Sequence, residues 1–366
     1  MRINSNTATM ILIIWGVIIA GAFALHPFLS NDIFASRDNP ILLRLPKGSI
    51  LDRYGVPLAT GEPREYPLGA AGEPLVWAYL ERRLSEQLTS KKSSKILYLF
   101  GGDGSCDVKT TIDSDLQRAS VAAIKDCTGA LVILKINGEI LSFASSPGFS
   151  PNGLTKERFD QIKEDKRALL SNRCETLYSP GSSFKILIAE KLIAKGLPEK
   201  PYYCRGHVKV GQKIIRCKTA HGLVDLKSAT RLSCNGYFIS RAISDLSEDD
   251  LVSAYNQFSS RQIKELPNKI DKAFFAIGQG NQNVLSPSEL AVISATIARN
   301  DGLKPVPVFL KKDISLTKAM DPKVTKQLAG LMTDVVDQGT ARGLRSSKYR
   351  IIAAKTDLLK WRPRRG

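Results

Sequence analysis

An uncharged stretch near the N-terminus, residues 8–25, restricts the fold of this chain more than any other feature. It is 18 residues long, its one polar residue is Thr9, and Pro27 follows it. A helix of this length spans most of a bilayer core, and helices satisfy their own backbone hydrogen bonds there. We therefore predict a single-pass membrane anchor at residues 8–26, preceded by a cytoplasmic tail at residues 1–7.

A cleaved signal peptide is the alternative interpretation of this stretch. Only Arg2 and the amino terminus precede it, so the charge signal for orientation is weak, and Ala22-Phe23-Ala24 is similar to a signal-peptidase site. Both interpretations deliver the rest of the chain across the membrane, where disulfides can form. We favour the retained anchor.

Length and charge bound the remaining chain. The 366 residues allow one large domain and a smaller one. The formal net charge of +18 favours anionic partners such as lipid head groups or acidic wall polymers, unless the basic residues only form a dispersed solvated surface. The densest basic stretches, residues 91–95 and 362–365, are short and not interleaved with aromatics, so nucleic acid is not an expected partner.

Turn-forming residues divide the chain after the anchor. Residues 47–60, KGSILDRYGVPLAT, are rich in turn residues, and residues 75–88 have the pattern of a helix. A Gly-Gly-Asp-Gly loop at 101–104 marks the boundary. We predict an extracytoplasmic pedestal or linker at residues 27–105 and a compact domain at residues 106–366.

The second part has the mixture of helices and strands expected for an α+β fold. TTIDSDLQRASVAAI predicts a helix capped by Asp113 or Ser114, and SPSELAVISATIARN predicts a buried helix that begins at Ser286. TGALVILKINGEILSFASSP predicts two strands joined by a turn at Asn137-Gly138.

Cysteine and histidine spacing argues against a metal site. The chain has no C-x-x-C pair and only three histidines, so we expect no zinc. Cys204 and Cys217 are the best candidates for a disulfide, because they flank a segment whose pattern predicts a hairpin with a Gly-Gln turn. Two separate buried thiols are the alternative.

YSPGSSFKILIAEKLIAKG places a serine and a lysine at the start of a helix. Pro180 and Gly181 mark a chain reversal, and the apolar periodicity predicts a helix that ends at Gly196. The positive end of the helix dipole favours a developing oxyanion at Ser182, and a residue three positions on lies on the same face. Lys185 can therefore reach the Ser182 hydroxyl, and it becomes a base if burial or a second cation lowers its pKa from about 10.4.

Two further short motifs follow: LSCNGYF contains Ser233 and Asn235, and AAKTD contains Lys355, Thr356 and Asp357. Each tripeptide is weak alone, because S-x-x-K also occurs at residues 315–318 and S-x-N at residues 150–152. Their order and their flanking sequences carry the interpretation.

With these flanks, the chain resembles the transpeptidase domain of class B penicillin-binding proteins, the serine acyltransferases that cross-link peptidoglycan and are acylated by β-lactams. The similarity runs in the family's order through KGSILDRYGVPLA, TIDSDLQ, GEILSFASSPGFSPN, YSPGSSFK, HGLVDLKSATRLSCNGYF, AIGQGNQNVLSPSELA and VVDQGTARGL. It implies a penicillin-binding or β-lactamase-like α+β domain, in which helices flank an antiparallel sheet. It also implies peptidoglycan stem peptides as substrates, no cofactor, and a polytopic glycosyltransferase partner at the bacterial cytoplasmic membrane.

The resemblance implies a role for each residue of the first two motifs. Ser182 is similar to the nucleophile that attacks the penultimate D-alanine carbonyl of a stem peptide, and Lys185 is similar to its general base. Ser233 would relay a proton, and Asn235 would hold the substrate amide.

The third motif supplies charge and substrate contacts in the same family. Lys355 would lower the pKa of Lys185 and share protons with the Ser233 hydroxyl, and Thr356 would hydrogen-bond the substrate carboxylate. The backbone N–H groups of Ser182 and Leu358 would form the oxyanion hole.

Asp357 stands where the family has glycine, beside the nucleophile, where a side chain has little room. Since residues i and i+2 of a strand share a face, we expect Asp357 beside Lys355, facing the substrate carboxylate. At about 4 Å and an effective dielectric of about 20, one like-charge contact costs about 4 kcal/mol, or about a thousandfold in rate.

The ending is the second departure from the family, because only 11 residues follow Lys355. We expect an incomplete domain without its C-terminal strands, in which the motif strand is an exposed edge. Loss of one nucleotide before the Asp357 codon would explain both departures, because restoring it gives AAKTGS or AAKTGP. A truncated pseudoenzyme is the competing explanation.

Three functions follow. The first is an anchored D,D-transpeptidase or its damaged form, and the second is a non-catalytic scaffold in a cell-wall synthesis complex. The third is a serine β-lactamase or D,D-carboxypeptidase, which the anchor and pedestal argue against.

Overall fold

A computed structural model describes residues 47–72, 75–88, 105–164, 172–197, 199–345 and 353–357. The predicted tail at residues 1–7, the predicted anchor at residues 8–26 and Leu358 lie outside the described residues. Within the described ranges, no helix is both long and apolar enough to cross a bilayer.

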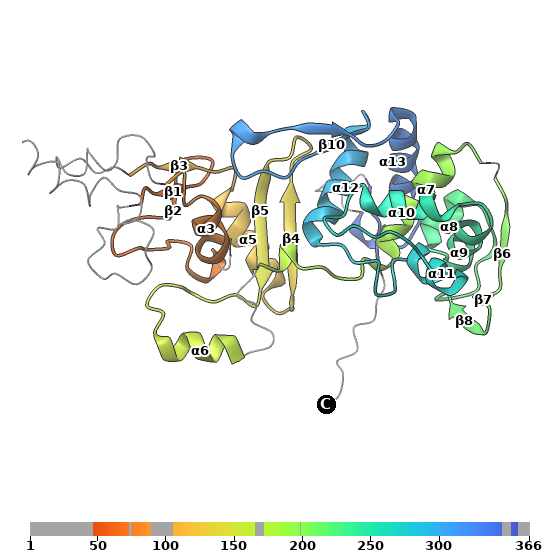
Figure 1. The fold of residues 1–366 in the computed structure, drawn as a ribbon, viewed down its shortest axis with the longest axis horizontal. Helices are drawn as coiled ribbons and strands as arrows, with labels where there is room; N and C mark the ends of the chain where they lie inside the picture. Colours follow the sequence, from red (N-terminus) through yellow and green to blue (C-terminus); the bar gives the residue numbers. More distant parts are fainter. Residues whose placement is uncertain are drawn as a thin grey trace, which may run out of the picture.

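A small three-stranded sheet begins the described chain (Figure 1). The central strand is antiparallel to one neighbour and parallel to the other. The strands are β1 (Ile50–Leu51), β2 (Pro57–Ala59) and β3 (Val108–Lys109). The buried Asp52 carboxylate holds the turn after β1, because it accepts hydrogen bonds from the backbone N–H groups of Tyr54 at 2.8 Å and Val56 at 2.9 Å.

Short helical segments follow β2, and the last two are continuous over residues 75–83 of the helix predicted at residues 75–88. They are η1 (Gly69–Ala71), the π-helix η2 (Leu75–Leu80) and α3 (Glu81–Arg83). Leu75 and Leu80 are buried in the same cluster as Phe143 and Phe309. The predicted pedestal therefore shares a core with the segment that follows it, and a boundary at residue 105 stays a prediction.

A hairpin forms the centre of the molecule, as the Asn-Gly signal predicts (Figure 1). Strands β4 (Gly129–Leu134) and β5 (Ile140–Ser146) are antiparallel, and Gly138 takes a φ of +100° in the turn. Helix α5 (Ser114–Ile124) packs on β5, and α12 (Pro287–Arg299) packs on β4. Among the named strands of the described chain, β4 and β5 pair only with each other.

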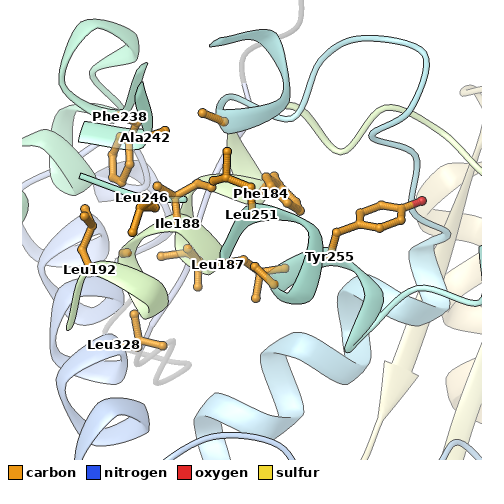
Figure 2. Close-up of a cluster of buried hydrophobic side chains, with 14 of the residues drawn as sticks. Phe184, Leu187, Ile188, Leu192, Phe238, Ala242, Leu246, Leu251, Tyr255 and Leu328 are labelled. Carbon is orange, nitrogen blue, oxygen red and sulfur yellow. The ribbon is translucent and has the colours of Figure 1, made fainter. Parts of the chain in front are cut away.

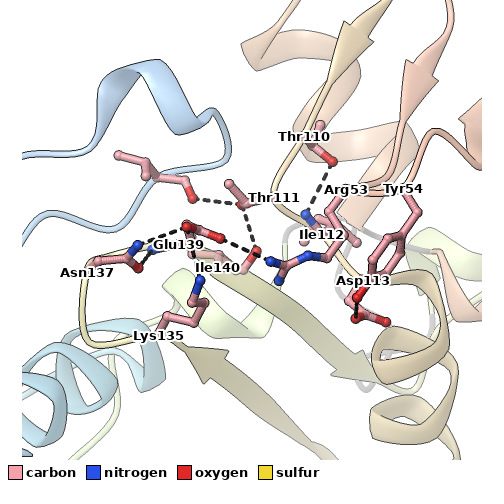
Figure 3. Close-up of polar contacts among 11 residues, drawn as sticks. Arg53, Tyr54, Thr110, Thr111, Ile112, Asp113, Lys135, Asn137, Glu139 and Ile140 are labelled. Atoms are coloured by element: carbon pink, nitrogen blue, oxygen red, sulfur yellow. Dashed lines mark hydrogen bonds and ion pairs between the residues drawn. The ribbon is translucent and has the colours of Figure 1, made fainter.

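A polar network joins this hairpin to the first sheet (Figure 3). The buried Glu139 carboxylate accepts from Asn137 Nδ2 at 2.8 Å and from Lys135 Nζ at 3.2 Å, and Arg53 Nη2 lies 3.5 Å from it. Although burial alone would raise the pKa of Glu139, these hydrogen bonds and charges hold it below its usual value. The charge network therefore fixes the N-terminal part against the hairpin.

A helical body surrounds the buried helix α7 (Lys185–Ala194) (Figure 2). Phe184, Tyr255 and Phe275 stack edge to face or tilted in its core, with ring centroids 5.0 to 6.4 Å apart. The other helical elements after residue 172 are η3 (Arg173–Glu175), η4 (Gly181–Phe184), α8 (Leu226–Leu232), α9 (Asn235–Ser244), α10 (Glu248–Asn256), α11 (Lys269–Ala276), η5 (Lys311–Asp313), α13 (Pro322–Asp337) and η6 (Arg342–Leu344). Helix α6 (Lys156–Glu164) precedes them, to one side of the hairpin in Figure 1.

Short strand pairs line the edge of this body. Strand β6 (Tyr202–Cys204) pairs with β9 (Gly222–Val224), and β7 (His207–Val210) pairs with β8 (Lys213–Arg216). The β7–β8 hairpin turns at Gly211, as its Gly-Gln signal predicts. Strand β10 (Leu303–Pro305) pairs with β11 (Leu316–Lys318).

The third motif does not form the predicted strand. Residues 353–357 have no strand pairing, and the backbone N–H of Ala354 donates to the carbonyl of Met332 in α13 at 3.1 Å. Strand geometry therefore no longer supports the expectation that Asp357 and Lys355 share one face. The mixed helix and strand content agrees with the α+β prediction.

Candidate active site

Ser182 lies in the 3₁₀ turn η4, directly before α7. Gly181 takes a φ of +55°, and its N–H donates to the carbonyl of Gly278 at 2.9 Å. A Cβ at Gly278 would lie 1.9 Å from the Gly181 carbonyl oxygen, so the two backbones approach too closely for a side chain. This contact fixes the reversal that the Pro-Gly pair predicts, and it presents Ser182 at the N-terminal end of the helix.

Lys185 contacts three of the other predicted site residues. Its side chain is fully buried, and Nζ lies 3.0 Å from Ser182 Oγ, 3.2 Å from Ser233 Oγ and 2.6 Å from Asn235 Oδ1. Burial and then the positive charge of Lys355 lower its pKa to about 7. The neutral amine is therefore well populated near neutral pH, and its lone pair can accept the Ser182 hydroxyl proton.

Ser233 and Asn235 reach Lys185 because the chain turns sharply between two helices. Ser233 ends α8 in the left-handed conformation, with a φ of +56°, which few non-glycine residues adopt. Cys234 then caps α9, so Ser233 and Asn235 both face the lysine. Asn235 also donates from Nδ2 to the carbonyl of Arg216 at 2.7 Å, which fixes its amide orientation.

The third motif also reaches the site. Lys355 Nζ lies 3.1 Å from Ser233 Oγ, and burial lowers its pKa to about 8, against the opposing effect of Asp357. Thr356 Oγ1 lies 2.6 Å from the hydroxyl of Thr340, which precedes η6. Thr340 was not predicted, although it lies within the family-like sequence VVDQGTARGL.

Asp357 contacts the backbone of Ser182. Its Oδ1 accepts a hydrogen bond from the Ser182 N–H at 3.0 Å. Its carboxylate also packs against Gly181, where a Cβ would lie 2.1 Å from Oδ2. The N–H groups at the start of a helix carry partial positive charge, which attracts a carboxylate. A fixed negative charge therefore occupies a donor that the family resemblance assigns to the oxyanion hole.

A cluster of three cysteines and a histidine behind the second motif was missed from the sequence. Sγ atoms of Cys204, Cys217 and Cys234 and a ring nitrogen of His221 all lie within 4.8 Å of one another. The predicted Cys204–Cys217 disulfide is not formed, because all six cysteines are free and these two Sγ atoms are 3.7 Å apart. The one sequence signal for this cluster is Cys234, which lies between Ser233 and Asn235 in the second motif.

The six predicted side chains therefore meet, with Ser182, Lys185, Ser233, Asn235 and Lys355 in one hydrogen-bonded set and Thr356 at its edge. A serine hydroxyl 3.0 Å from the amine of a buried lysine, at the start of a buried helix, defines a serine–lysine acyl-transfer class of site. The proposed oxyanion residue Leu358 lies outside the described residues.

Comparison with known proteins specifies the family. Residues 128–356 match the family described as the penicillin binding protein transpeptidase domain. The peptidoglycan D,D-transpeptidase MrdA of Acinetobacter baumannii is 27% identical over 300 residues, which cover 68% of this chain and 44% of the relative. The match to the family covers more than half of the chain, which therefore belongs to it.

Solved structures share the fold. The crystal structure of PBPA from Mycobacterium tuberculosis superposes with a TM-score of 0.70 at 23% identity, covering 80% of this chain and 83% of that one. A penicillin G acyl-enzyme complex of penicillin-binding protein A from the same organism gives a TM-score of 0.69 at 24% identity, covering 80% and 83%. This likeness confirms the penicillin-binding fold, whereas the chain spans under half the length of MrdA.

Proposed function

We propose that this protein is a serine acyltransferase of the D,D-transpeptidase type, which cross-links peptidoglycan and is acylated by β-lactams at Ser182. The observation that carries the proposal is the position of Lys185 Nζ, within hydrogen-bonding distance of Ser182, Ser233 and Asn235 at once. We further propose that Asp357 slows the reaction, because its carboxylate holds the Ser182 N–H.

The acylation step follows from these contacts. Neutral Lys185 accepts the Ser182 hydroxyl proton while Oγ bonds to the carbonyl carbon of the penultimate D-alanine. The bond from that carbon to the nitrogen of the terminal D-alanine then breaks, and a proton that passes through Ser233 goes to the leaving amine. An ester on Ser182 and free D-alanine result.

The transfer step reverses the proton movements. The amine of a second stem peptide attacks the ester carbonyl and gives a proton to the site, and Ser182 Oγ leaves and regains a proton. A peptide cross-link forms. In this proposal Asn235 holds the substrate amide and the Thr356 hydroxyl binds the substrate carboxylate. Lys355 lowers the pKa of Lys185 and shares protons with Ser233, which its 3.1 Å contact with Ser233 Oγ supports.

The cellular setting is part of the proposal. The uncharged stretch at residues 8–25 supports a single-pass anchor in the bacterial cytoplasmic membrane, with the acyltransferase outside the cytoplasm. The family resemblance supports a polytopic glycosyltransferase as the membrane partner, because cross-linking requires newly polymerised glycan strands.

A non-catalytic scaffold is the second candidate, and the contact between Asp357 and the Ser182 N–H favours it. Without that donor, the charge that develops on the carbonyl oxygen loses one of its stabilising hydrogen bonds. The two candidates differ in whether Ser182 can be acylated at all.

A fluorescent penicillin distinguishes them. We expect slow covalent labelling of the purified full chain, with mass spectrometry of peptides locating the adduct on Ser182 and no labelling of Ser182→Ala. In this adduct the β-lactam C–N bond is broken, the ester joins Ser182 Oγ, and the ring nitrogen takes the proton. A folded chain that gives no adduct, both as it stands and with Asp357→Gly, would support the scaffold.

The pH dependence of penicillin acylation is a separate prediction. The rate should rise with pH through about 7, where Lys185 loses its proton and becomes a base, and fall above about 8, where Lys355 loses its charge. Stopped-flow labelling across this interval measures both limbs. Lys125→Arg, an exposed control, should leave the profile unchanged, and a flat profile would rule out lysine as the base.

A further inference from the structure

The cysteine and histidine cluster has the shape of a metal site. Cys204 Sγ lies 3.7 Å from Cys217 Sγ and 3.5 Å from His221 Nδ1, and Cys217 Sγ lies 4.0 Å from Cys234 Sγ. With Zn–S bonds of about 2.3 Å and Zn–N bonds of about 2.0 Å, the edges of a zinc tetrahedron are about 3.8 Å between sulfurs and about 3.5 Å between sulfur and nitrogen. The three distances match those edges.

Backbone N–H groups surround the sulfur atoms. Gly206 N lies 3.4 Å from Cys204 Sγ, Gly236 N lies 3.5 Å from Cys217 Sγ, and Tyr237 N lies 3.5 Å from Cys234 Sγ. Each sulfur therefore has a backbone N–H donor beside it, and such hydrogen bonds stabilise and orient metal-bound thiolates. Cys204 and Cys234 are buried, and Cys217 is half-buried, so a bound ion would be shielded from solvent.

The four residues come from four different segments. Cys204 ends β6, Cys217 follows β8, His221 precedes β9, and Cys234 caps α9. The antiparallel pairing of β6 with β9 sets Cys204 opposite Gly222, beside His221. A single ion would therefore link the small strand pairs to the helix that carries Asn235.

The geometry points to a structural zinc site in which Cys204, Cys217, His221 and Cys234 bind one Zn²⁺ in a closed tetrahedron. Three thiolates and one imidazole are the donor set that Zn²⁺ takes in such sites, and a full shell leaves no position for a reacting water. On binding, each thiol releases its proton to solvent, and no electron is transferred.

A disulfide fits the cluster less well. A bond between two of the cysteines needs Sγ atoms about 2.05 Å apart, much closer than any pair here. It would also leave the third cysteine and His221 without a role. A zinc ion uses all four residues with little movement.

A zinc ion at this site would affect the second motif, because two of its ligands lie next to Ser233, Asn235 and the hydrogen-bond partner of Asn235. Cys234 lies between Ser233 and Asn235, and Cys217 follows Arg216, whose carbonyl accepts the Asn235 amide at 2.7 Å. One ion would hold both sides of this contact. We infer that zinc positions Ser233 and Asn235 against Lys185 without contacting substrate.

Metal content of the full chain, purified under reducing conditions, tests the proposal without any measurement of activity. We expect about one zinc per chain by inductively coupled plasma mass spectrometry. Replacement by Co²⁺ should give strong thiolate-to-metal absorption and the intense visible bands of a tetrahedral site. Thiol titration of the unfolded, chelated chain should find all six cysteines reduced.

Variants locate the ion. Cys217→Ser and His221→Ala should each lose most of the zinc and melt at a lower temperature, whereas Cys127→Ser, an exposed cysteine outside the cluster, should keep both. If the ligand variants do not fold, the Co²⁺ spectrum of the unmodified chain decides. Four reduced thiols with no metal, six reduced thiols with no metal, or another metal at this site would each overturn the proposal.

Discussion

Asp357→Gly should raise the rate of penicillin acylation by about 10²- to 10³-fold, because removal of one oxyanion donor from an acyl-transfer site costs about that much. In the present chain the Ser182 N–H donates to Asp357 Oδ1 at 3.0 Å, so it is not free for the carbonyl oxygen of a substrate. Glycine removes both the acceptor and the negative charge. Stopped-flow labelling with a fluorescent penicillin measures the gain.

Asp357→Asn is the matched control for this change. Asparagine keeps the size of the side chain, and its amide oxygen can still accept the Ser182 N–H, but it carries no charge. If occupation of the Ser182 N–H is the cause, this variant recovers only part of the gain, whereas a full recovery would assign the effect to charge alone. Equal rates in all three proteins would show that Asp357 does not restrain the site.

Lys185→Met should reduce acylation about a thousandfold or more when introduced together with Asp357→Gly, because it removes the base next to Ser182 Oγ. Methionine fills a similar buried volume, and it carries no charge that needs desolvation. The melting temperature should therefore stay unchanged or rise. Labelling rates and thermal unfolding of the double variant and of Asp357→Gly measure the two effects.

Lys195→Met serves as a control at the end of the same helix. Lys195 is exposed, caps the end of α7 opposite to Lys185, and pairs with Asp250 at 2.7 Å. The control should label as fast as Asp357→Gly alone. Labelling that survives in the Lys185→Met double variant would rule out Lys185 as the general base, while a lowered melting temperature with intact labelling would make it a structural residue.

Local patterns predicted much of the fold correctly. The Asn-Gly turn located the β4–β5 hairpin, and Ser286 with Glu289 forms the capping box that begins α12. Both depend on residues within a few positions of one another, so neighbouring sequence contains the whole signal. The same holds for Ser182 and Lys185, which meet because three residues are about one helical turn.

Local patterns failed where distant segments decide the geometry. The helix predicted over residues 75–88 forms only over residues 75–83, as the π-helix η2 continued by α3, and its Leu75 and Leu80 pack into a core shared with Phe143 and Phe309. The direction of the Asp357 side chain was predicted from strand geometry, but residues 353–357 have no strand pairing. The Asp357 carboxylate instead accepts a hydrogen bond from the Ser182 N–H at the start of the helix.

The sequence by itself determined that Ser182 and Lys185 lie together at a helix start, the order of the three motifs and the family, because these depend on residue type, short spacing and flanking context. Only the tertiary structure decided which donor Asp357 occupies and that Cys204, Cys217, His221 and Cys234 meet behind Asn235. Those contacts join residues that are distant along the chain. Strand pairing and helix packing set their distances, and spacing in the sequence does not encode them.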